Sequence, residues 1–274
     1  MIINHNLSAM NTHRQLGVNS GNLSKNVEKL SSGYRINRAA DDAAGLSISE
    51  RMRSQIRGMD QASRNAQDGI SLVQTAEGAL QTVNDMLVRI KELATQAANG
   101  TYDKTNDLPR INEEVAELAK EIENISTNTK FNGIQLLNGS GPVDLQIGIE
   151  AAQKLTLDDK EFDISAVVTA VKGAGYTWAD NAAANAQLKD IEDQINTVSA
   201  ARSYLGANQN RLENTINNLN TTSENLQSAE SRIRDLDMAK EQMAFTKNNI
   251  LTQAAQAMLA QANQLPQGVL QLLR

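Results

Sequence analysis

Small and apolar residues recur at alternating steps of four and three between residues 41 and 99. The row consists of Met52, Ile56, Met59, Ser63, Ala66, Ile70, Val73, Leu80 and Leu87, with Glu77 as its one charged member. This period puts a narrow apolar stripe on one side of an α-helix, which is typical of a coiled-coil seam. No proline interrupts it, so a helix over 43–98 would be roughly 80 Å long. A rod of this length predicts a second long element beside it.

Two further stretches carry the helical period. The first begins near Asp107 and follows Leu108, Ile111, Val115, Leu118, Ile122 and Ile125. Because the connection over 100–106 is short, this helix should fold back antiparallel on the long one. The second begins near 179 and repeats every seven residues, at Leu205, Leu212, Leu219, Leu226 and Ile233. We expect a rod seam made of that heptad row together with Met52, Ile56, Ile70, Leu80, Ile111, Leu118 and Ile122.

The middle of the chain changes to a period of two. The alternating residues are Val143, Leu145, Ile147 and Ile149, followed by Leu155 and Leu157. Alternation of this kind predicts a small β-hairpin. Residues 158–178 show no clear period, but Gly173, Gly175 and Trp178 are typical of a loop with an anchor. The expected fold class is therefore mainly α, with long antiparallel coiled-coil rods and a small β-hairpin element in the middle.

Glycines inside the long helix leave two interpretations open. Gly58 and Gly69 are eleven residues apart, which returns to nearly the same side of a helix. Each glycine lowers helix stability by about 1 kcal/mol relative to alanine. They are either tolerated points of flexibility or positions where a neighbouring helix or subunit approaches the backbone closely.

The two ends carry thinner apolar stripes. Ile3, Leu7 and Met10 begin the first, whose pattern breaks near Gly17 and Gly21. The last helix places Leu251, Met258 and Leu265 on one side, and Pro266 should end it before Val269 and Leu270. Such stripes are too weak to hold isolated helices. We therefore expect both ends to stay unpaired and disordered until several copies of the chain meet.

These patterns predict five segments. The terminal segments are 1–42 and 237–274, the rod helices are 43–142 and 179–236, and the short β-bearing middle is 143–178. A linker precedes the long helix, with Asp41 or Asp42 as its N-cap.

Composition narrows the functional classes. The chain is 40% hydrophobic but only 3% aromatic, which suits close helix–helix packing. A net charge of −6 argues against nucleic-acid binding. No stretch is apolar for long enough to predict a membrane-spanning helix. The first residues lack the basic and apolar regions of a cleavable signal peptide.

The sequence carries no recognisable catalytic or metal-binding motif. His5 and His13 are eight residues apart, there is no cysteine, and no HExxH motif occurs. The carboxylate pairs at 41–42 and 113–114 are typical of helix caps and solvated faces. We expect no enzyme, no cofactor and no metal site.

Long runs at both ends resemble one family. They are INHNLSAMNT at 3–12, KLSSGYRINRAADDAAGLSISE at 29–50, the wider run 37–80, and ANQLPQGVLQLLR at 262–274. Together they resemble bacterial flagellin, in a short form without large variable outer domains. The resemblance implies an extracellular subunit that polymerises with itself into the flagellar filament used for swimming.

The family resemblance also implies an export route and partners. Export would run through the flagellar type III apparatus, unfolded and without a cleaved signal peptide. The partners would be an export chaperone that masks the C-terminal segment, and the hook-associated and cap proteins. The inner tube of the filament would be formed by Ile3, Leu7, Met10, Leu251, Met258, Leu265, Val269 and Leu270.

A motif on the long helix resembles the flagellin site read by the flagellin-sensing Toll-like receptor of a host. The motif LxRxxELAxQxxN spans 87–99, and the receptor-binding residues would be Arg89, Leu93 and Glu114. Val88 departs from the glutamine common in the family. The alternative is that Arg89 and Glu114 only decorate a subunit contact.

Two other classes compete with a filament subunit. A hook–filament junction protein would share the flagellin-like ends, but should match less well over 37–80. A non-flagellar coiled-coil scaffold would explain the heptads but not the apolar ends. Seeding with short filament fragments distinguishes them, because only a filament subunit should elongate the seeds.

Overall fold

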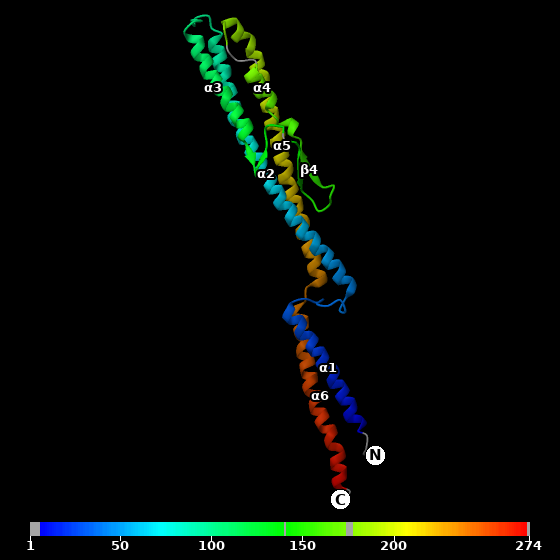
Figure 1. Cartoon of the computed structure of the whole chain (residues 1–274). Coiled ribbons are helices and arrows are strands. Elements are labelled where there is room, and N and C mark those ends of the chain that lie inside the picture. The colour runs from blue at the N-terminus through cyan, green and yellow to red at the C-terminus, as the bar shows by residue number, and fades with distance from the viewer. Residues whose placement is uncertain (1–5, 140, 174–177, 273–274) are drawn as a thin grey trace. The chain divides into compact units, whose positions relative to one another are not determined.

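The computed structural model describes residues 6–139, 141–173 and 178–272, and the chain divides into two units. One unit is Met1–Ile56 with Glu224–Arg274, and the other is Arg57–Ser223. Helices α2 (Ala43–Ala97) and α5 (Asn181–Arg234) each contribute to both units (Figure 1). The expected fold class is confirmed, because long helices dominate and the strands are few and short. The five-segment division stays a prediction.

In the unit Arg57–Ser223, α2 and α5 run antiparallel. Lys91 on α2 lies 3.7 Å from Glu192 on α5, and Glu77 lies 3.7 Å from Arg202. Higher numbers on α2 thus meet lower numbers on α5. The buried core between them contains Val73, Leu80, Leu87, Val198, Leu205 and Leu212. The partner expected for the long helix is therefore α5, and Glu77 remains in the apolar row because Arg202 pairs with it.

Helix α3 spans Asp107–Asn128, as the sequence predicts. Its buried residues Leu108, Ile111, Val115 and Ile122 belong to the same core as α2 and α5. Strands β1 (Lys130–Phe131) and β2 (Ile134–Gln135) follow as a tight antiparallel pair. Asn132 and Gly133 both have positive φ angles, +49° and +84°, which the two-residue turn requires.

The predicted β-hairpin is confirmed as strands β3 (Val143–Gln146) and β4 (Lys154–Leu157). Leu145 lies opposite Leu155, and the side chains of Leu155 and Leu157 are buried. The hairpin packs on α2 at the two glycines. A methyl group added at Gly58 would lie 2.7 Å from Ile149 Cγ2, and one at Gly69 would lie 2.5 Å from Leu145 Cδ1. Of the two interpretations, close approach is right, but the neighbour is chiefly the hairpin's side chains.

The stretch 158–173, which the sequence left ambiguous, is largely helical. It contains a short 3₁₀-helix, η1 (Asp159–Glu161), and helix α4 (Ser165–Gly173). The Asp163 carboxylate caps α4 by accepting from Ser165 N at 2.7 Å. Val167 and Val171 are four residues apart, so both lie on one face of α4 and pack against the core. In sequence, a single helical turn of valines cannot be distinguished from a strand. Residues 174–177 lie outside the described residues.

Trp178 is the anchor that the sequence predicts. Its side chain is buried, its indole Nε1 donates to Gln187 Oε1 at 2.8 Å, and its backbone N donates to Asn112 Oδ1 at 2.9 Å. The start of α5 is thereby tied to α3.

In the other unit, α1 (Leu7–Ser32) and α6 (Met238–Leu272) lie side by side and antiparallel (Figure 1). The Asn6 side chain near the start of α1 donates to Ala262 O on α6 at 2.8 Å. The expected break near Gly17 and Gly21 is wrong, because α1 is continuous and packing on α6 outweighs the weak helix propensity of glycine. The helix α6 also continues past Pro266, since one lost backbone hydrogen bond need not end a helix.

Candidate assembly surface

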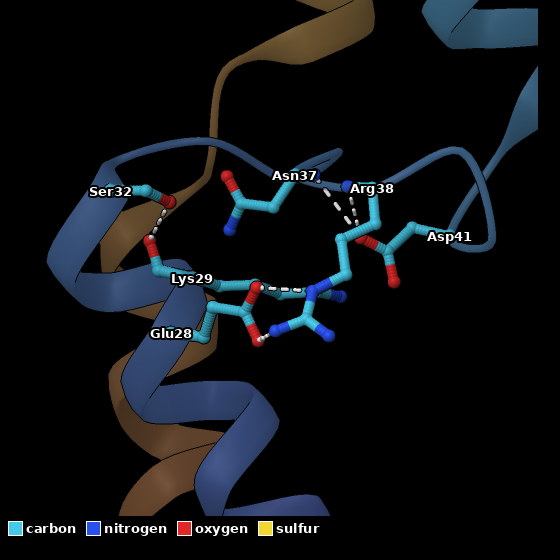
Figure 2. Close-up of polar contacts among 6 residues, drawn as sticks. All are labelled: Glu28, Lys29, Ser32, Asn37, Arg38 and Asp41. Carbon is cyan, nitrogen blue, oxygen red and sulfur yellow. Dashed lines mark hydrogen bonds and ion pairs between the residues drawn. The ribbon is translucent and has the colours of Figure 1, made fainter.

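The segment 33–42 between α1 and α2 is held by polar contacts. Asp41 accepts hydrogen bonds from the backbone N atoms of Asn37 at 3.1 Å and Arg38 at 3.0 Å (Figure 2). These two bonds hold the pKa of the Asp41 carboxyl below its ordinary value. The Arg38 guanidinium forms a two-bond ion pair with Glu28 on α1. Asp42, rather than Asp41, is the N-cap of α2, because it accepts from Gly45 N at 2.8 Å.

The same segment pairs with the chain that connects α5 to α6. Tyr34 and Asp235 form an isolated antiparallel bridge. Arg35 N donates to Arg234 O at 2.7 Å, and Leu236 N donates to Gly33 O at 3.0 Å. Backbone hydrogen bonds therefore hold the segment that follows α1 against the segment that precedes α6.

In its described part, the unit that contains α1 and α6 has almost no apolar core. Among its described residues, the buried hydrophobic side chains are Ile36 and Ala262. The unit Arg57–Ser223, by contrast, has a continuous core that runs from α2 through α3 and the hairpin to α5. Burial of apolar surface is the main favourable term in folding. The first unit obtains little of that term within a single chain.

The contact between α1 and α6 is partly polar. Asn19 and Asn26, seven residues apart on α1, are 7% and 9% exposed. With its amide oriented to satisfy its neighbours, Asn26 donates to Glu241 Oε1 and accepts from Asn248 Nδ2, both at 3.0 Å. Buried asparagine at a heptad position fixes the register of two helices and lowers their stability.

Leu16, Leu23 and Leu30 are half-buried, but many other apolar side chains of this pair are exposed. The large exposed ones on α1 and α6 are Leu7, Met10, Val18, Val27, Met238, Met243, Ile250, Leu251 and Met258. On α6, Met243, Ile250 and Leu251 help to line a shallow, mostly apolar hollow. We call the outward faces of α1 and α6 that carry these residues the assembly surface. Apolar patches of this kind mark interaction sites.

The structure places the residues predicted for the inner tube as follows. Leu7 is 69% exposed, Met10 66%, Leu251 39% and Met258 60%. Ile3 lies outside the described residues, as do the side chains of Leu265, Val269 and Leu270. The expectation that both ends stay unpaired in one chain is wrong, because α1 and α6 are ordered helices that pair with each other. Their pairing nevertheless leaves Leu7, Met10 and Met258 mostly exposed.

The rod-seam residues lie inward, to different extents. The buried ones are Leu80, Ile111, Ile122, Leu205 and Leu212, and the half-buried ones are Met52, Ile56, Ile70, Leu118, Leu219, Leu226 and Ile233. Burial on α5 thus declines beyond Leu212. In the first unit, α2 and α5 are linked by the ion pair of Arg53 with Glu230 at 3.1 Å.

The predicted receptor motif has two members at the surface. Arg89 on α2 contacts Glu114 on α3 at 2.9 Å and Glu92 at 3.0 Å, and these groups are about half exposed. The hydrogen bond to Glu92, followed in size by that to Glu114, raises the pKa of the Arg89 guanidinium above its ordinary value. Leu93 is 2% exposed, so its assignment as a contact residue is wrong: it packs in the core.

Among the residues that the structure describes, no group of three or more His, Cys, Asp or Glu side chains lies close enough to hold a metal ion. No described helix combines the length and apolar character that a membrane span requires.

Residues 3–141 match the family described as the bacterial flagellin N-terminal helical region, and residues 188–273 match the bacterial flagellin C-terminal helical region. The chain belongs to the bacterial flagellin family. Only residues 142–187 lie between the two matched regions, so this is a short flagellin without a large variable outer domain.

Full-length relatives support the same assignment. The chain is 57% identical to a flagellin of Halalkalibacterium halodurans and 54% identical to one of Bacillus subtilis, covering all of both chains in each case. It is also 46% identical to a flagellar filament 33 kDa core protein of Treponema phagedenis, again over the whole of both chains.

Solved structures resemble parts of the chain. The crystal structure of Bacillus cereus flagellin has a TM-score of 0.52 and 30% identity, covering 57% of this chain and 88% of that one. A putative flagellar hook-associated protein from Vibrio parahaemolyticus has a TM-score of 0.60 over 71% of this chain and all of its own. At 14% identity, the second likeness concerns the fold alone.

Sequence identity to flagellins over the full length distinguishes a filament subunit from a hook–filament junction protein. The chain is a structural subunit of the bacterial flagellar filament, and nothing favours a junction protein or a scaffold. Its place of action is the extracellular filament.

Proposed function

We propose that the assembly surface is where one copy of this chain binds others in the filament. The observation that carries the proposal is that the described residues of the unit containing α1 and α6 bury very little apolar surface. Large apolar side chains, such as Met243 at 68% and Ile250 at 61% exposure, are mostly uncovered within the chain. Burying one such side chain contributes about 1.5–3 kcal/mol. Neighbouring copies would supply the stabilisation that a single chain lacks.

The polar contact between α1 and α6 supports this division of roles. Asn19 and Asn26 occupy the contact within the chain, whereas Val18 and Val27, one residue away from each, are about half exposed. The pair is thereby held in register while its apolar residues stay available on other faces. Different faces on one subunit form heterologous contacts, and these give an open helical polymer when they do not close into a ring. The proposal assigns the chain no catalytic activity.

A pair of matched substitutions tests the assembly surface. Ile250→Asp places a charge on the exposed face of α6, so elongation of short filament seeds should stop while the circular dichroism spectrum is unchanged. Ile134→Asp makes the same change at a 43% exposed position on β2 and should leave elongation intact. Elongation by Ile250→Asp at the unsubstituted rate would exclude this face from assembly.

Before assembly, the same surface needs protection. We propose that the chain is exported unfolded through the flagellar type III apparatus, without a cleaved signal peptide, and that an export chaperone covers the apolar side of α6. Co-purification with that chaperone should be lost in Ile250→Asp and retained in Ile134→Asp. Sequencing of the exported protein should find Met1 or Ile2 at its N-terminus, and a later start would contradict export without cleavage.

At the two ends of the filament, the uncovered surface of the last subunits would contact the hook-associated and cap proteins. Adding the purified cap protein to seeds should therefore block elongation at one end. Growth at an unchanged rate would contradict a shared surface.

A host Toll-like receptor that senses flagellin is the further partner that we propose for the outer face of α2 and α3. The support is the ion pair between Arg89 and Glu114, which is presented at half exposure on adjacent helices. Leu93 would act from inside by holding α2 in place. In a cell-reporter assay, Arg89→Ala should lower potency, whereas Lys120→Ala, an exposed α3 position outside the motif, should not. Equal potency of both variants would remove the assignment.

A further inference from the structure

Exposed methionines are concentrated on the assembly surface. Within the described residues, the methionines that are half or more exposed are Met10 at 66%, Met238 at 51%, Met243 at 68% and Met258 at 60%. The remaining described ones, Met52, Met59 and Met86, are half-buried or buried. All four exposed thioethers thus lie on α1 and α6, on the surface that assembly would cover.

We infer that these four methionines form a peroxide-sensitive modification site that determines whether a free chain can join a filament. The inference rests on the proposed role of the assembly surface. In the reaction, a sulfur lone pair attacks one oxygen of hydrogen peroxide, the O–O bond breaks and an S–O bond forms. The departing hydroxide takes up the proton that remains on the sulfur-bound oxygen, so the products are methionine sulfoxide and water.

Oxidation changes what each side chain brings to the surface. The thioether of methionine is apolar and flexible and packs well at interfaces. The sulfoxide is polar and must lose bound water when it is covered. Met243 shows the conflict most clearly, because it lines the apolar hollow on α6 beside Ile250 and Leu251. The hydroxyl of Thr246 in the same hollow already donates to Gln242 O at 2.9 Å, so its proton is not free to bond a sulfoxide oxygen.

Assembly and oxidation therefore oppose each other. Peroxide should reach these four exposed side chains in the single chain, and the modified chain can no longer cover them without losing hydration. Once the chain is in a filament, neighbouring copies would shield the same atoms. The modification should act on unassembled subunits and spare finished filaments, and methionine sulfoxide reductase should reverse it.

The test compares seeded elongation before and after a limited dose of hydrogen peroxide. The oxidised residues are identified by peptide mass spectrometry. Oxidation at Met10, Met238, Met243 and Met258 should slow elongation about tenfold or more, the effect of leaving one polar group unsatisfied on burial. Reductase treatment should restore the rate. Assembled filaments given the same dose should show much less sulfoxide at these positions.

A variant separates these residues from other targets of peroxide. The combined substitution Met10→Leu, Met238→Leu, Met243→Leu and Met258→Leu keeps apolar volume, so its elongation should resist the same dose. The matched control Met52→Leu with Met86→Leu should stay sensitive. Full elongation by the oxidised natural chain, or a rate that reductase fails to restore, would overturn the inference. Failure of the untreated natural chain to elongate seeds would instead count against the proposed function.

Discussion

Gly69 on α2 lies so close to Leu145 on β3 that a methyl group on the glycine would stand 2.5 Å from Leu145 Cδ1. Gly69→Ala must therefore displace Leu145 from the place where the hairpin packs on α2. Gly78 is the matched control, because a methyl group there meets nothing within 4 Å. Gly78→Ala should stabilise the chain by up to about 1 kcal/mol through helix propensity. Gly69→Ala should be about 1–3 kcal/mol less stable than that variant.

Thermal unfolding followed by circular dichroism measures both variants. Equal midpoints for Gly69→Ala and Gly78→Ala would show that the hairpin does not need the glycine. The stability of the chain would then not depend on the close approach of Gly69 to Leu145.

The heptad row of α5 should lose its energetic importance toward the C-terminal end of the helix. Leu212 is completely buried, so Leu212→Ala should cost about 2–5 kcal/mol. Leu219 is half-buried beside a groove that it lines with Ile147, so Leu219→Ala should cost about half as much or less. Denaturant unfolding gives both values. A larger loss for Leu219→Ala would mean that the seam is buried more deeply than the side-chain exposures indicate.

Asn26 should set the register of α1 on α6 at the expense of stability. Asn26→Leu replaces its contacts with Glu241 and Asn248 by an apolar contact, so the thermal midpoint should hold or rise while alternative registers become populated. Because the chain has no cysteine, spin labels can be placed cleanly through Ser20→Cys and Gln253→Cys. Electron–electron double resonance should then show a broader distance distribution. An unchanged narrow distribution with a lower midpoint would assign Asn26 a purely stabilising role.

The β3–β4 hairpin should loosen in acid. Lys154 Nζ lies 2.6 Å from Asp144, and this bond, followed by that from Thr156, holds the pKa of Asp144 below 3.8. A carboxyl with a lowered pKa in the folded state contributes stability above its unfolded pKa. That contribution is lost as pH falls from 3.8 through the lower folded value.

Nuclear magnetic resonance titration of the Leu155 and Leu157 amides tests this dependence. The low-pH change should be present in the natural chain and absent in Asp144→Asn. Titration of Asp144 at or above 3.8 would contradict the stated cause.

The long rods could be predicted from sequence because their signal repeats over many turns. The apolar row of α2 and the heptad row of α5 both reach the core, where Leu80 and Leu205 are buried. Helix α4 could not be predicted in the same way, because its single apolar turn, Val167 and Val171, has too few residues to distinguish a helix from a strand. The role of Asp163 as its cap becomes evident only with the fold.

The assembly surface was predictable only in part. Leu7, Met10 and Met258 were expected to be unsatisfied from their thin apolar stripes, and each is exposed. Periodicity alone did not indicate that α1 and α6 would pair through Asn19 and Asn26, because an apolar row does not identify the helix that packs against it or the polar residues that the contact includes. Likewise, the motif around Arg89 did not reveal that Leu93 points into the core, since sequence order specifies a helix face but not what covers it.

Electron cryo-microscopy of filaments grown from the purified chain tests the central claim most directly. The quantity to measure is the exposed fraction of Leu7, Met10, Met243, Ile250 and Met258, which is 60–69% at each position in the single chain. We predict that neighbouring subunits bury these side chains in the filament. Filaments in which they remain as exposed as in the single chain, or a purified chain that forms no filaments, would contradict the account.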